Sequence, residues 1–485
     1  MMTWGVFDSL PLIVSAVLLA YWIVIVVVLI NDGRDPTATV TWVVLLTVLP
    51  GLGLILYFFF GRNWEKKTMR SRWARTIPGV MKPTLQRIHE RYSAEASEAT
   101  SWSIEKGYGD LTRLIQTTDG AIPLPAYDVD IITSGRDKFD KLIADLAHAR
   151  DTINLQYFIW ERDELTARIT DVLLDRIAAG VEVRILNDFI GNIQYRKDEM
   201  RRLRTAGARV RYDVTDLGKV NYRDHQKIAV IDGAIGYTGG MNVGQEYIDG
   251  GRRFPAWRDT HVRFTGPAVA DLQKLFARPW HRQTGESLFC ERFFPLEYPT
   301  GSVSSPAQVV STAAENPWEP ARRAHVVAMG LARDTLWIQS PYFVPDDALN
   351  EAIVNVALSG VDVRLMLSGL ADKKIVWYAA ESYFRPILEA GGRIFHYQAG
   401  FMHAKTMTVD GTLCSIGTMN LDVRSLQLHK ELMVWFYDAE LAGRHDRIFE
   451  ADLEHCEEYT IERLDSLTPL RVFRDSAARL ISDLL

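Results

Sequence analysis

A five-position pattern that occurs twice, with the same spacing in both copies, constrains the fold of this chain more than any other feature. Each copy reads HxKx4D and is followed seven residues later by GxxN. The pattern residues are His225, Lys227, Asp232 and Asn242 in the first copy, and His403, Lys405, Asp410 and Asn420 in the second. One HxK alone means little, because any strand places residues i and i+2 on the same face. Two equally spaced copies instead predict a duplicated fold.

Three further pairs of segments support the duplication. Residues 153–158 resemble 337–343, residues 180–186 resemble 360–366, and residues 206–210 resemble 391–394. Each set reads as strand, helix, strand, helix, strand, which indicates an α/β fold. We therefore expect two similar mixed β-sheet units flanked by helices, at 119–290 and at 321–485, the second ending in a C-terminal helix. Prolines, glycines and serines cluster between these units, so 291–320 is expected to be a linker.

The N-terminal residues 1–61 contain two long apolar stretches. Residues 10–30 and 38–60 are each long enough, at about 1.5 Å per helical residue, to cross a hydrocarbon core of about 30 Å. A signal peptide is disfavoured, because no Lys or Arg precedes the first stretch and no small-residue cleavage site is obvious. The sequence therefore predicts a two-helix transmembrane hairpin ahead of the two α/β units.

A basic juxtamembrane connector, 62–118, follows the apolar stretches. It opens with Arg62, Lys66, Lys67, Arg70, Arg72 and Arg75. Because positive residues stay on the cytoplasmic side, this cluster predicts a multi-pass protein of the cell membrane whose large C-terminal part is cytoplasmic. The same charges would also hold anionic headgroups near that part.

Composition argues against several other classes of protein. The formal net charge is −6, so the chain lacks the basic excess of a general nucleic-acid binder. Its three cysteines, Cys290, Cys414 and Cys456, form no CxxC pair, which argues against a zinc site or a disulfide framework. No carboxylate cluster or histidine spacing suggests another metal site. We expect neither a metal nor any other cofactor.

The duplicated residue types suit chemistry at a phosphodiester. Such a reaction needs a nucleophile, a proton donor for the departing alkoxide, and positive charge around the phosphate. Two imidazoles can divide the first two tasks, because one can attack phosphorus to form a phosphohistidine while the other protonates the leaving group. The ammonium groups of Lys227 and Lys405, with the amides of Asn242 and Asn420, can bind the nonbridging oxygens.

Four acidic residues have different expected roles. Asp259 and Glu431 occupy corresponding places after the two GxxN turns, and we expect them to orient the two imidazoles. Asp232 and Asp410 belong to the catalytic motif, yet each directly precedes Gly, where a carboxylate typically stabilises a turn. For these two we favour the structural role. The nine other histidines, including His429, lack the paired context and are assigned no role.

The duplicated pattern resembles that of the phospholipase D superfamily over about residues 119–438. Resemblance to bacterial cardiolipin synthases rests on Pro50-Gly-Leu-Gly53, Tyr57-Phe-Phe-Phe-Gly61, Gln156-Tyr157-Phe158, Trp257-Arg258-Asp259-Thr260 and Asp422-Val-Arg424-Ser425. The resemblance implies a two-repeat phospholipase D fold in which both halves build one shared active site. It implies a phosphohistidine, with His225 as nucleophile and His403 as general acid. The implied reaction transfers a phosphatidyl group between two phosphatidylglycerol molecules and releases glycerol.

The partners implied are phosphatidylglycerol and other anionic membrane phospholipids, with the protein embedded in the membrane and no nucleic acid bound. Two alternatives stay open. A hydrolase of the same fold would release phosphatidic acid as a phospholipase D, or cut nucleic acid as an endonuclease, although a membrane anchor disfavours the latter. A non-catalytic membrane scaffold would have no need of two intact motifs. The sequence does not separate water from an alcohol as acceptor, and it leaves open the second lipid substrate and the oligomeric state.

Overall fold

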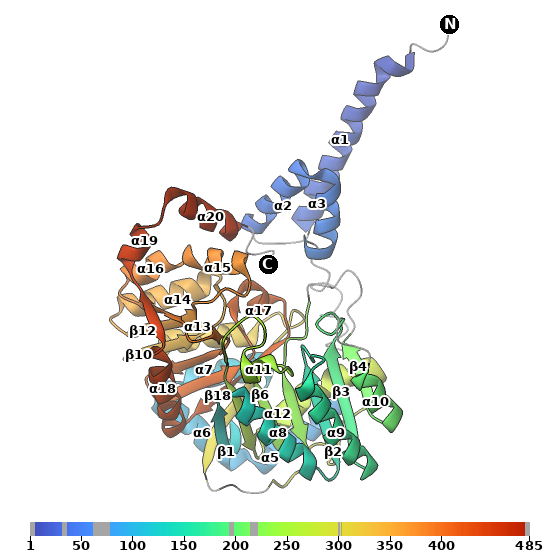
Figure 1. Ribbon diagram of the computed structural model, residues 1–485, viewed down its shortest axis with the longest axis vertical. Coiled ribbons are helices and arrows are strands. Elements are labelled where there is room, and N and C mark those ends of the chain that lie inside the picture. Colours follow the sequence, from blue (N-terminus) through green and yellow to red (C-terminus); the bar gives the residue numbers. More distant parts are fainter. Residues whose placement is uncertain are drawn as a thin grey trace.

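The core of the molecule is one large mixed β-sheet with helices packed on it (Figure 1). It is seen in a computed structural model that describes residues 5–31, 36–61, 78–193, 198–213, 222–298, 301 and 303–480. Within this part of the chain, 15 strands join into a single sheet. Each predicted unit supplies about half of the strands, and the two halves meet edge to edge at the centre.

The strand order shows the duplication predicted from the sequence. From its outer edge inwards, the first half runs β4 (Arg209–Asp213), β3 (Glu182–Asp188), β2 (Thr152–Tyr157), β5 (Ile228–Ile231), β6 (Ile235–Gly239), β8 (His261–Thr265) and β1 (Leu124–Ile132). The second half runs β19 (Cys456–Tyr459), β13 (Arg393–Tyr397), β12 (Asp362–Ser368), β10 (Thr335–Gln339), β15 (Thr406–Val409), β16 (Leu413–Gly417), β18 (Glu431–Tyr437) and β9 (Ser304–Thr312). In each half three parallel neighbours are followed by antiparallel strands. The prediction of an α/β fold is confirmed, and the strands of the two predicted units form one continuous mixed sheet.

The halves are joined by an antiparallel pair, β1 with β9, at the centre of the sheet. Tyr127 lies opposite Ser304, and Pro125 lies opposite Pro306. The structure thus assigns the segment 291–320 differently from the sequence, which predicted only a linker there. The β-branched pair Val309 and Val310, with the threonine that ends β9, favours a strand more strongly than the nearby prolines favour a turn.

Strand β18 shows why the centre of the sheet reads as a continuous apolar run. All of its residues are buried. Leu432, Val434 and Phe436 pack in the same core as helices α12 (Val269–Thr284) and α18 (Ala439–Leu453). The alternate residues Met433 and Trp435 pack in the core that contains α13 (Pro320–Leu331) and α14 (Asp347–Leu358). Both faces are covered, so both sets of side chains are apolar.

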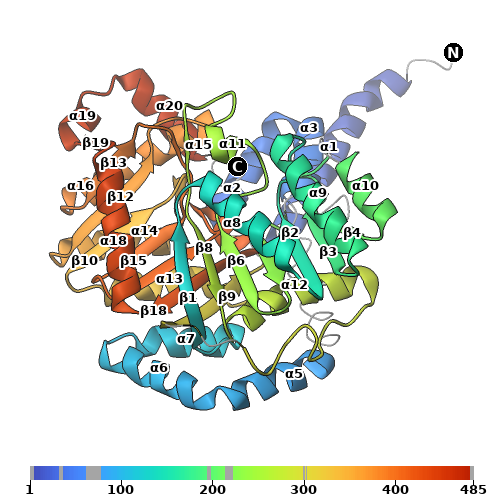
Figure 2. The ribbon, with the colours of Figure 1, turned by 60° about the horizontal axis from the view of Figure 1, so that its bottom comes forward.

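The expected connector 62–118 is in large part a folded portion of the catalytic body. Helices α5 (Pro78–Arg91), α6 (Ser93–Glu105) and α7 (Gly109–Asp119) lie along the end of the molecule opposite α1 to α3 (Figure 2). Leu111 and Ile115, one helical turn apart, are fully buried in the core that contains α13. Residues 62–77, which carry the basic cluster, lie outside the described residues.

The sequence predicts a C-terminal helix at the end of the second unit, but the chain beyond α18 is not wholly helical. β19 adds an edge strand antiparallel to β13. Two helices follow, α19 (Ile461–Asp465) and α20 (Pro469–Leu480), the second of which packs against α15 (Lys374–Glu381).

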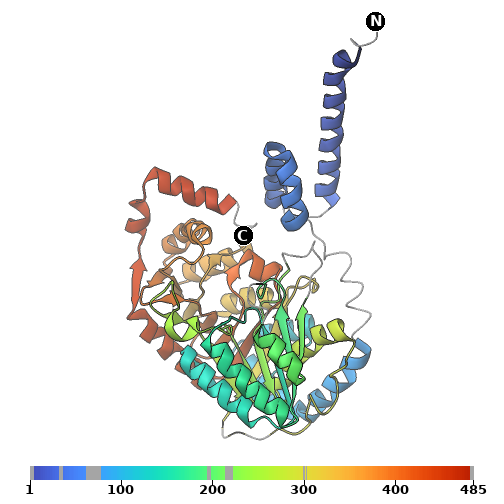
Figure 3. The same ribbon diagram turned by 45° about the vertical axis from the view of Figure 1, so that its right-hand side comes forward.

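The N-terminal segment departs from the prediction of two membrane-spanning helices, although α1 and α2 pack against each other through Ile25, Leu29, Trp42 and Leu46. α1 spans Gly5–Asn31, but the second apolar stretch is divided into α2 (Pro36–Val48), α3 (Pro50–Leu56) and a π-helical turn at Tyr57–Gly61. The division falls at Pro50, which has no backbone N–H to continue the helix from α2. Among the residues described, no helix is both long enough and apolar enough to cross a membrane. The prediction of a two-helix transmembrane hairpin is therefore not supported, although these helices do project from one end of the molecule (Figure 3).

Candidate active site

The alternation argument predicts that each HxK motif lies inside a strand. In the structure the two motifs lie just before strands β5 and β15. The backbone N–H of His225 donates to the carbonyl of Lys430 at 3.0 Å, and that of His403 donates to the carbonyl of Arg258 at 2.7 Å. Each motif therefore bonds to a segment of the other repeat instead of continuing its own strand ladder. Lys430 and Arg258 directly precede the two carboxylates expected to orient the imidazoles.

The segments that contain Arg258 and Lys430, called the crossed segments below, each bring a carboxylate of one repeat to the histidine of the other. Nδ1 of His225 lies 2.9 Å from Oε1 of Glu431. Nδ1 of His403 lies 2.7 Å from Oδ2 of Asp259. The structure thus brings all four residues together, and each imidazole of one repeat faces a carboxylate of the other. A carboxylate on Nδ1 leaves Nε2 as the nitrogen available to a ligand.

The second residue of each GxxN turn contacts the carboxylate of the same repeat. An added Cβ on Gly240 would lie 2.0 Å from Oδ1 of Asp259, so only glycine leaves room there. The corresponding Thr418 donates from Oγ1 to Oε2 of Glu431 at 2.6 Å. The repeats are therefore similar in design but differ in how each carboxylate is held.

An ion pair fixes each crossed segment to the opposite repeat. Arg258 pairs with Asp452, with Nη2 and Oδ2 2.6 Å apart. Lys430 pairs with Asp213, and its ammonium also lies 3.8 Å from Asp224. All of these groups are largely buried, so losing one partner would leave a charge without compensation.

Lys227 and Lys405 are buried beneath the histidines of their own motifs. Nζ of Lys227 donates to the carbonyl of His225 at 2.6 Å, and Nζ of Lys405 donates to the carbonyl of His403. Burial lowers the pKa of Lys227 to about 7 and that of Lys405 to about 8. Neither side chain is among those that line the adjacent cavity.

A cavity of about 330 Å³ lies between the two repeats. His225 and His403 line it together with Asn242 and Asn420, so both motifs open on one space. Its other lining residues are Phe158, Ile159, Arg223, Glu246, Tyr247, Arg253, Trp257, Tyr342, Val344, Asp372, Lys373, Val376, Asp422, Arg424 and His429. Aromatic rings flank both catalytic candidates: the Phe158 ring lies 4.8 Å from His225, and the Trp257 ring lies 5.5 Å from His403.

Basic groups outnumber acidic ones around this cavity. Some of these charges are already engaged: Asp372 pairs with Arg253, Arg223 pairs with Asp188, and Asp422 accepts from the backbone N–H of Ser425. Within the part of the chain that the structure describes, no three His, Cys, Asp or Glu side chains are grouped to hold a metal ion. The lining is instead suited to an anionic ligand such as a phosphate ester.

The amides of the two asparagines are held by side chains and backbone of their own repeats. Oδ1 of Asn242 accepts from the N–H of Ile159 at 3.2 Å, and its Nδ2 donates to the hydroxyl of Tyr247 at 3.0 Å. Nδ2 of Asn420 donates to Oγ of Ser425 at 3.2 Å. Asn420 Oδ1 is buried without a hydrogen-bond partner among the described residues.

Burial governs the protonation of the central groups. It lowers the pKa of His403 to about 4, with Lys405 adding to the shift, and it holds the pKa of His225 well below its usual range. It also raises the pKa of Glu431 to about 8, against the opposing effect of the Lys227 ammonium. The proton affinities of Glu431 and Lys227 are thereby brought close together.

Asp232 and Asp410 are not placed at the cavity. The carboxylate of Asp232 accepts from the backbone N–H groups of residues 150–152 at 2.8, 2.8 and 2.9 Å. That of Asp410 accepts in the same way from residues 333–335. Both residues have positive φ, +51° and +50°, at a turn before glycine. This geometry supports the structural role.

His429, which the sequence analysis set aside, also lines the cavity. Its ring centroid lies 6.0 Å from that of His225. The signal that could have revealed it is positional, because His429 stands two residues before Glu431, as Trp257 stands two residues before Asp259. Alternation along the two crossed segments places both residues on the cavity side.

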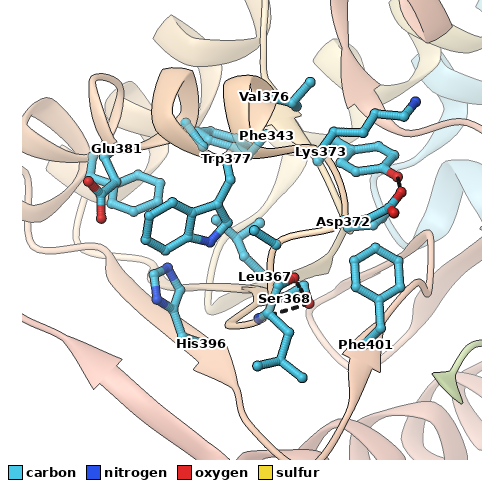
Figure 4. Close-up of a pocket in the computed structure, with 16 residues that line it drawn as sticks. Phe343, Leu367, Ser368, Asp372, Lys373, Val376, Trp377, Glu381, His396 and Phe401 are labelled. Atoms are coloured by element: carbon cyan, nitrogen blue, oxygen red, sulfur yellow. Dashed lines mark hydrogen bonds between the residues drawn. The ribbon is translucent and has the colours of Figure 1, made fainter. Parts of the chain in front are cut away.

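A small apolar pocket adjoins the cavity and shares Tyr342, Asp372, Lys373 and Val376 with it. Trp377 projects into this pocket towards His396, with the ring centroids 6.3 Å apart (Figure 4). Its volume is about 20 Å³, which is room for about one water molecule and not for a lipid chain.

Two protein-family models match the chain. The one described as "Cardiolipin synthase, PLD-like domain" matches residues 142–256 and 326–453, which contain both HxK motifs. The one described as "Phospholipase_D-nuclease N-terminal" matches residues 19–62.

Curated relatives are similar over nearly the whole chain. A cardiolipin synthase of Oceanobacillus iheyensis is 36% identical over 463 residues, which cover 94% of this chain and 95% of that protein. A major cardiolipin synthase of Bacillus subtilis is 33% identical over 488 residues, which cover 97% and 100% of the two chains. Among solved structures, a phosphatidylserine synthase of Haemophilus influenzae covers 78% of this chain and all of its own, with a TM-score of 0.57 and 16% identity. That likeness shows the fold alone.

Proposed function

The chain belongs to the cardiolipin synthases of the phospholipase D superfamily, and from this premise we propose that it transfers a phosphatidyl group between two molecules of phosphatidylglycerol. The products are cardiolipin and glycerol. The observation that carries the proposal is the single cavity on which His225 and His403 both open, each held by a carboxylate of the other repeat. One phosphodiester replaces another in this reaction, so no energy-rich donor is needed.

In the first step, Nε2 of His225 attacks phosphorus of the donor lipid. Burial lowers the pKa of His403 in the free enzyme, but an anionic phosphate bound in the cavity favours its imidazolium form. The new P–N bond forms as the bond from phosphorus to the glycerol oxygen breaks, and this imidazolium gives its proton to that oxygen. Glycerol leaves, and a phosphatidyl group remains on His225. Glu431, which contacts Nδ1, stabilises the positive charge that develops on the imidazole as Nε2 bonds to phosphorus.

In the second step, the primary hydroxyl of another phosphatidylglycerol takes the place of the departed glycerol. Neutral His403 accepts the hydroxyl proton while the oxygen attacks phosphorus and the P–N bond breaks. His225 is released and His403 is again protonated, so the catalytic groups return to their starting state. The buried position of both histidines supports an alcohol as acceptor, because water is largely kept from the intermediate.

Positive charge close to the phosphate supports both steps. Lys227 and Lys405 lie directly beneath the two histidines, and Asn242 and Asn420 line the cavity. An anionic phosphate in the cavity favours the ammonium form of Lys227. The Lys227 ammonium in turn lowers the pKa of Glu431, so the same change favours an ionised Glu431. An ionised Glu431 keeps the His225 proton on Nδ1 and leaves Nε2 with its lone pair.

The N-terminal segment is proposed to associate the enzyme with the membrane that contains its substrates. Support comes from the family match at residues 19–62 and from the many exposed apolar side chains of α1 and α2, such as Ile30 and Val48 at 71% and 69%. The basic cluster that begins at Arg62 favours the cytoplasmic leaflet, whose anionic lipids attract such segments.

The experiment that tests this function is product analysis with purified full-length enzyme and phosphatidylglycerol as the only lipid. We expect cardiolipin and glycerol in equal amounts. Phosphatidic acid with glycerol would instead make the enzyme a hydrolase, and the transferase assignment would fail.

A further inference from the structure

The C-terminal helix α20 presents an apolar stripe to solvent. Leu470, Phe473 and Leu480 are 77%, 72% and 66% exposed. They stand at positions i, i+3 and i+10, and Ala477 fills position i+7, so all four lie along one side of the helix. A helix that packs on a protein core normally turns such a stripe inwards. α20 does the opposite.

The polar side of α20 holds it to the protein. The guanidinium of Arg474 lies 3.7 Å from the centre of the Tyr378 ring and 3.7 Å from Oε2 of Glu381, both on α15. Asp475 is buried on the same side. Ala478 is also buried, in the core that contains α13. α20 is therefore fixed to the protein by charged, aromatic and short apolar contacts, while its large apolar side chains are left without a partner in the described part of the chain.

We propose that this stripe inserts into the surface of an anionic phospholipid membrane, with α20 lying in the plane of that surface. The charge of the helix fits such a surface. Arg471 and Arg479 are exposed, although the Arg479 guanidinium also lies 4.3 Å from the centre of the Tyr383 ring, whereas Asp475, the only acid in α20, is buried. Exposed positive charge beside an apolar stripe is the pattern by which interfacial helices bind anionic headgroups while burying apolar side chains.

The position of α20 agrees with a membrane at this end of the molecule. α20 and the N-terminal helices α1 to α3 lie at the same end in all three ribbon views (Figures 1, 2 and 3). The N-terminal helices also expose large apolar side chains, among them Ile30 at 71% and Val40 at 62%. One lipid surface can therefore take up both groups of apolar side chains.

A second copy of the chain fits the stripe less well. α20 has 12 residues, whereas a coiled-coil pair needs about three to four heptads. Three large side chains also bury far less than the roughly 1,200 Å² of a specific interface. Lipid requires neither a long stripe nor a complementary surface.

Docking of α20 would place the catalytic cavity next to its lipids. α15, on which α20 packs, contributes Val376 to the cavity wall, and Val376 lies beside Lys373 at the start of that helix (Figure 4). The inference concerns how the enzyme meets the membrane, so it holds for a transferase and for a hydrolase alike.

A fluorescent probe on α20 tests the contact directly. Full-length protein with Phe473→Cys, and with Cys290→Ser and Cys456→Ser to remove the cysteines that are not buried, is labelled with nitrobenzoxadiazole and reconstituted with phosphatidylglycerol vesicles. We expect emission at shorter wavelength and quenching by nitroxide-labelled lipid. The matched control is Leu358→Cys on α14, a position that is 67% exposed, where no change is expected. Equal behaviour of the two probes would overturn the proposal. Disulfide-linked dimers of the unlabelled Phe473→Cys protein, formed with an added oxidant, would also overturn it if the labelled protein shows no spectral shift.

Activity on two forms of the substrate separates this proposal from the proposed reaction. The double variant Leu470→Glu/Phe473→Glu alters only exposed side chains, so the fold is expected to stay intact. Turnover of phosphatidylglycerol in vesicles should fall at least about tenfold, while turnover of a soluble short-chain phosphatidylglycerol stays unchanged. Unchanged turnover in vesicles would overturn the docking role. An unaltered chain that is inactive on both substrates would contradict the proposed reaction and leave the probe experiment to decide the membrane contact.

Discussion

Nδ1 of His225 lies 2.9 Å from Oε1 of Glu431, although the two residues stand 206 positions apart and belong to different repeats. The reverse pairing joins His403 to Asp259 across 144 positions. Each repeat thus supplies one imidazole and the carboxylate that orients the other. Neither repeat holds an imidazole and its carboxylate partner by itself, so the proposed active site requires both halves to be folded together.

The crossed carboxylates should control turnover rather than binding. In Glu431→Gln or Asp259→Asn the side chain keeps its size but loses the charge that holds the proton on Nδ1. We expect kcat for phosphatidyl transfer to fall by about 10²–10⁴-fold, the usual contribution of an acid–base group, with little change in KM. Steady-state kinetics check this, with the exposed Glu454→Gln as control. Near-normal kcat in both variants would remove the orienting role.

Asp232 and Asp410 should affect stability and not chemistry. Asp232→Ala removes an acceptor for three backbone N–H groups at a left-handed position, which we expect to cost about 1–3 kcal/mol of the free energy of unfolding. Asp232→Asn keeps one acceptor oxygen and tolerates positive φ, so its loss should be smaller. Denaturant unfolding measures both, and kcat per folded molecule should stay normal. A stable Asp232→Asn protein with greatly reduced kcat would return this residue to the catalytic set.

Local spacing explains why much of the site could be predicted from the sequence. The catalytic motif, the GxxN turns and the two orienting carboxylates each lie within short segments, and their repetition identified them. Which carboxylate meets which histidine could not be predicted in this way. That choice depends on contacts such as the parallel pair between β7 (Trp257–Arg258) and β14 (Phe401–Met402), which no local pattern records.

The lowered pKa values of the two lysines predict a pH dependence. Burial lowers the pKa of Lys227 to about 7 and that of Lys405 to about 8, so each ammonium is present below its pKa and is lost above it. As pH rises through this window, the free enzyme loses positive charge near the phosphate. Ionisation of Glu431, whose pKa is about 8, favours turnover in the same window, so the lysines are tested through KM. We expect KM for anionic phosphatidylglycerol to rise with pH, and a KM that stays level or falls over this range would contradict the phosphate-binding role.

His429 should contribute to substrate binding. Both of its ring nitrogens are buried and lack hydrogen-bond partners among the described residues, and the ring lines the cavity. In the complex, the His429 ring would donate a hydrogen bond to the charged phosphate of the substrate. The variant His429→Ala loses this bond, which should lower kcat/KM by about tenfold to a hundredfold. Thermal stability should change little, and the exposed His455→Ala serves as control. Unaltered kinetics would limit His429 to a passive part of the wall.

The least accurate predictions concern segments whose structure depends on contacts with distant parts of the chain or on a local break in a helix. A central strand at Ser304–Thr312 looked like a linker because its prolines signal turns, while its partner β1 lies far away in the chain. The second apolar stretch met the length criterion for a membrane span, but that criterion ignored the interruption at Pro50. Composition alone does not resolve such local breaks.

The central claim is that one imidazole from each repeat acts at the same phosphorus, with His225 as the nucleophile. Phosphatidyl p-nitrophenol tests it, because this leaving group needs no proton from a general acid. Mass spectrometry of the protein after mixing should find a phosphatidyl group on His225 in the His403→Ala variant, together with a burst of one p-nitrophenol per active site. The His225→Ala variant should give neither. A phosphatidyl group on His403 in that second variant would contradict the assignment.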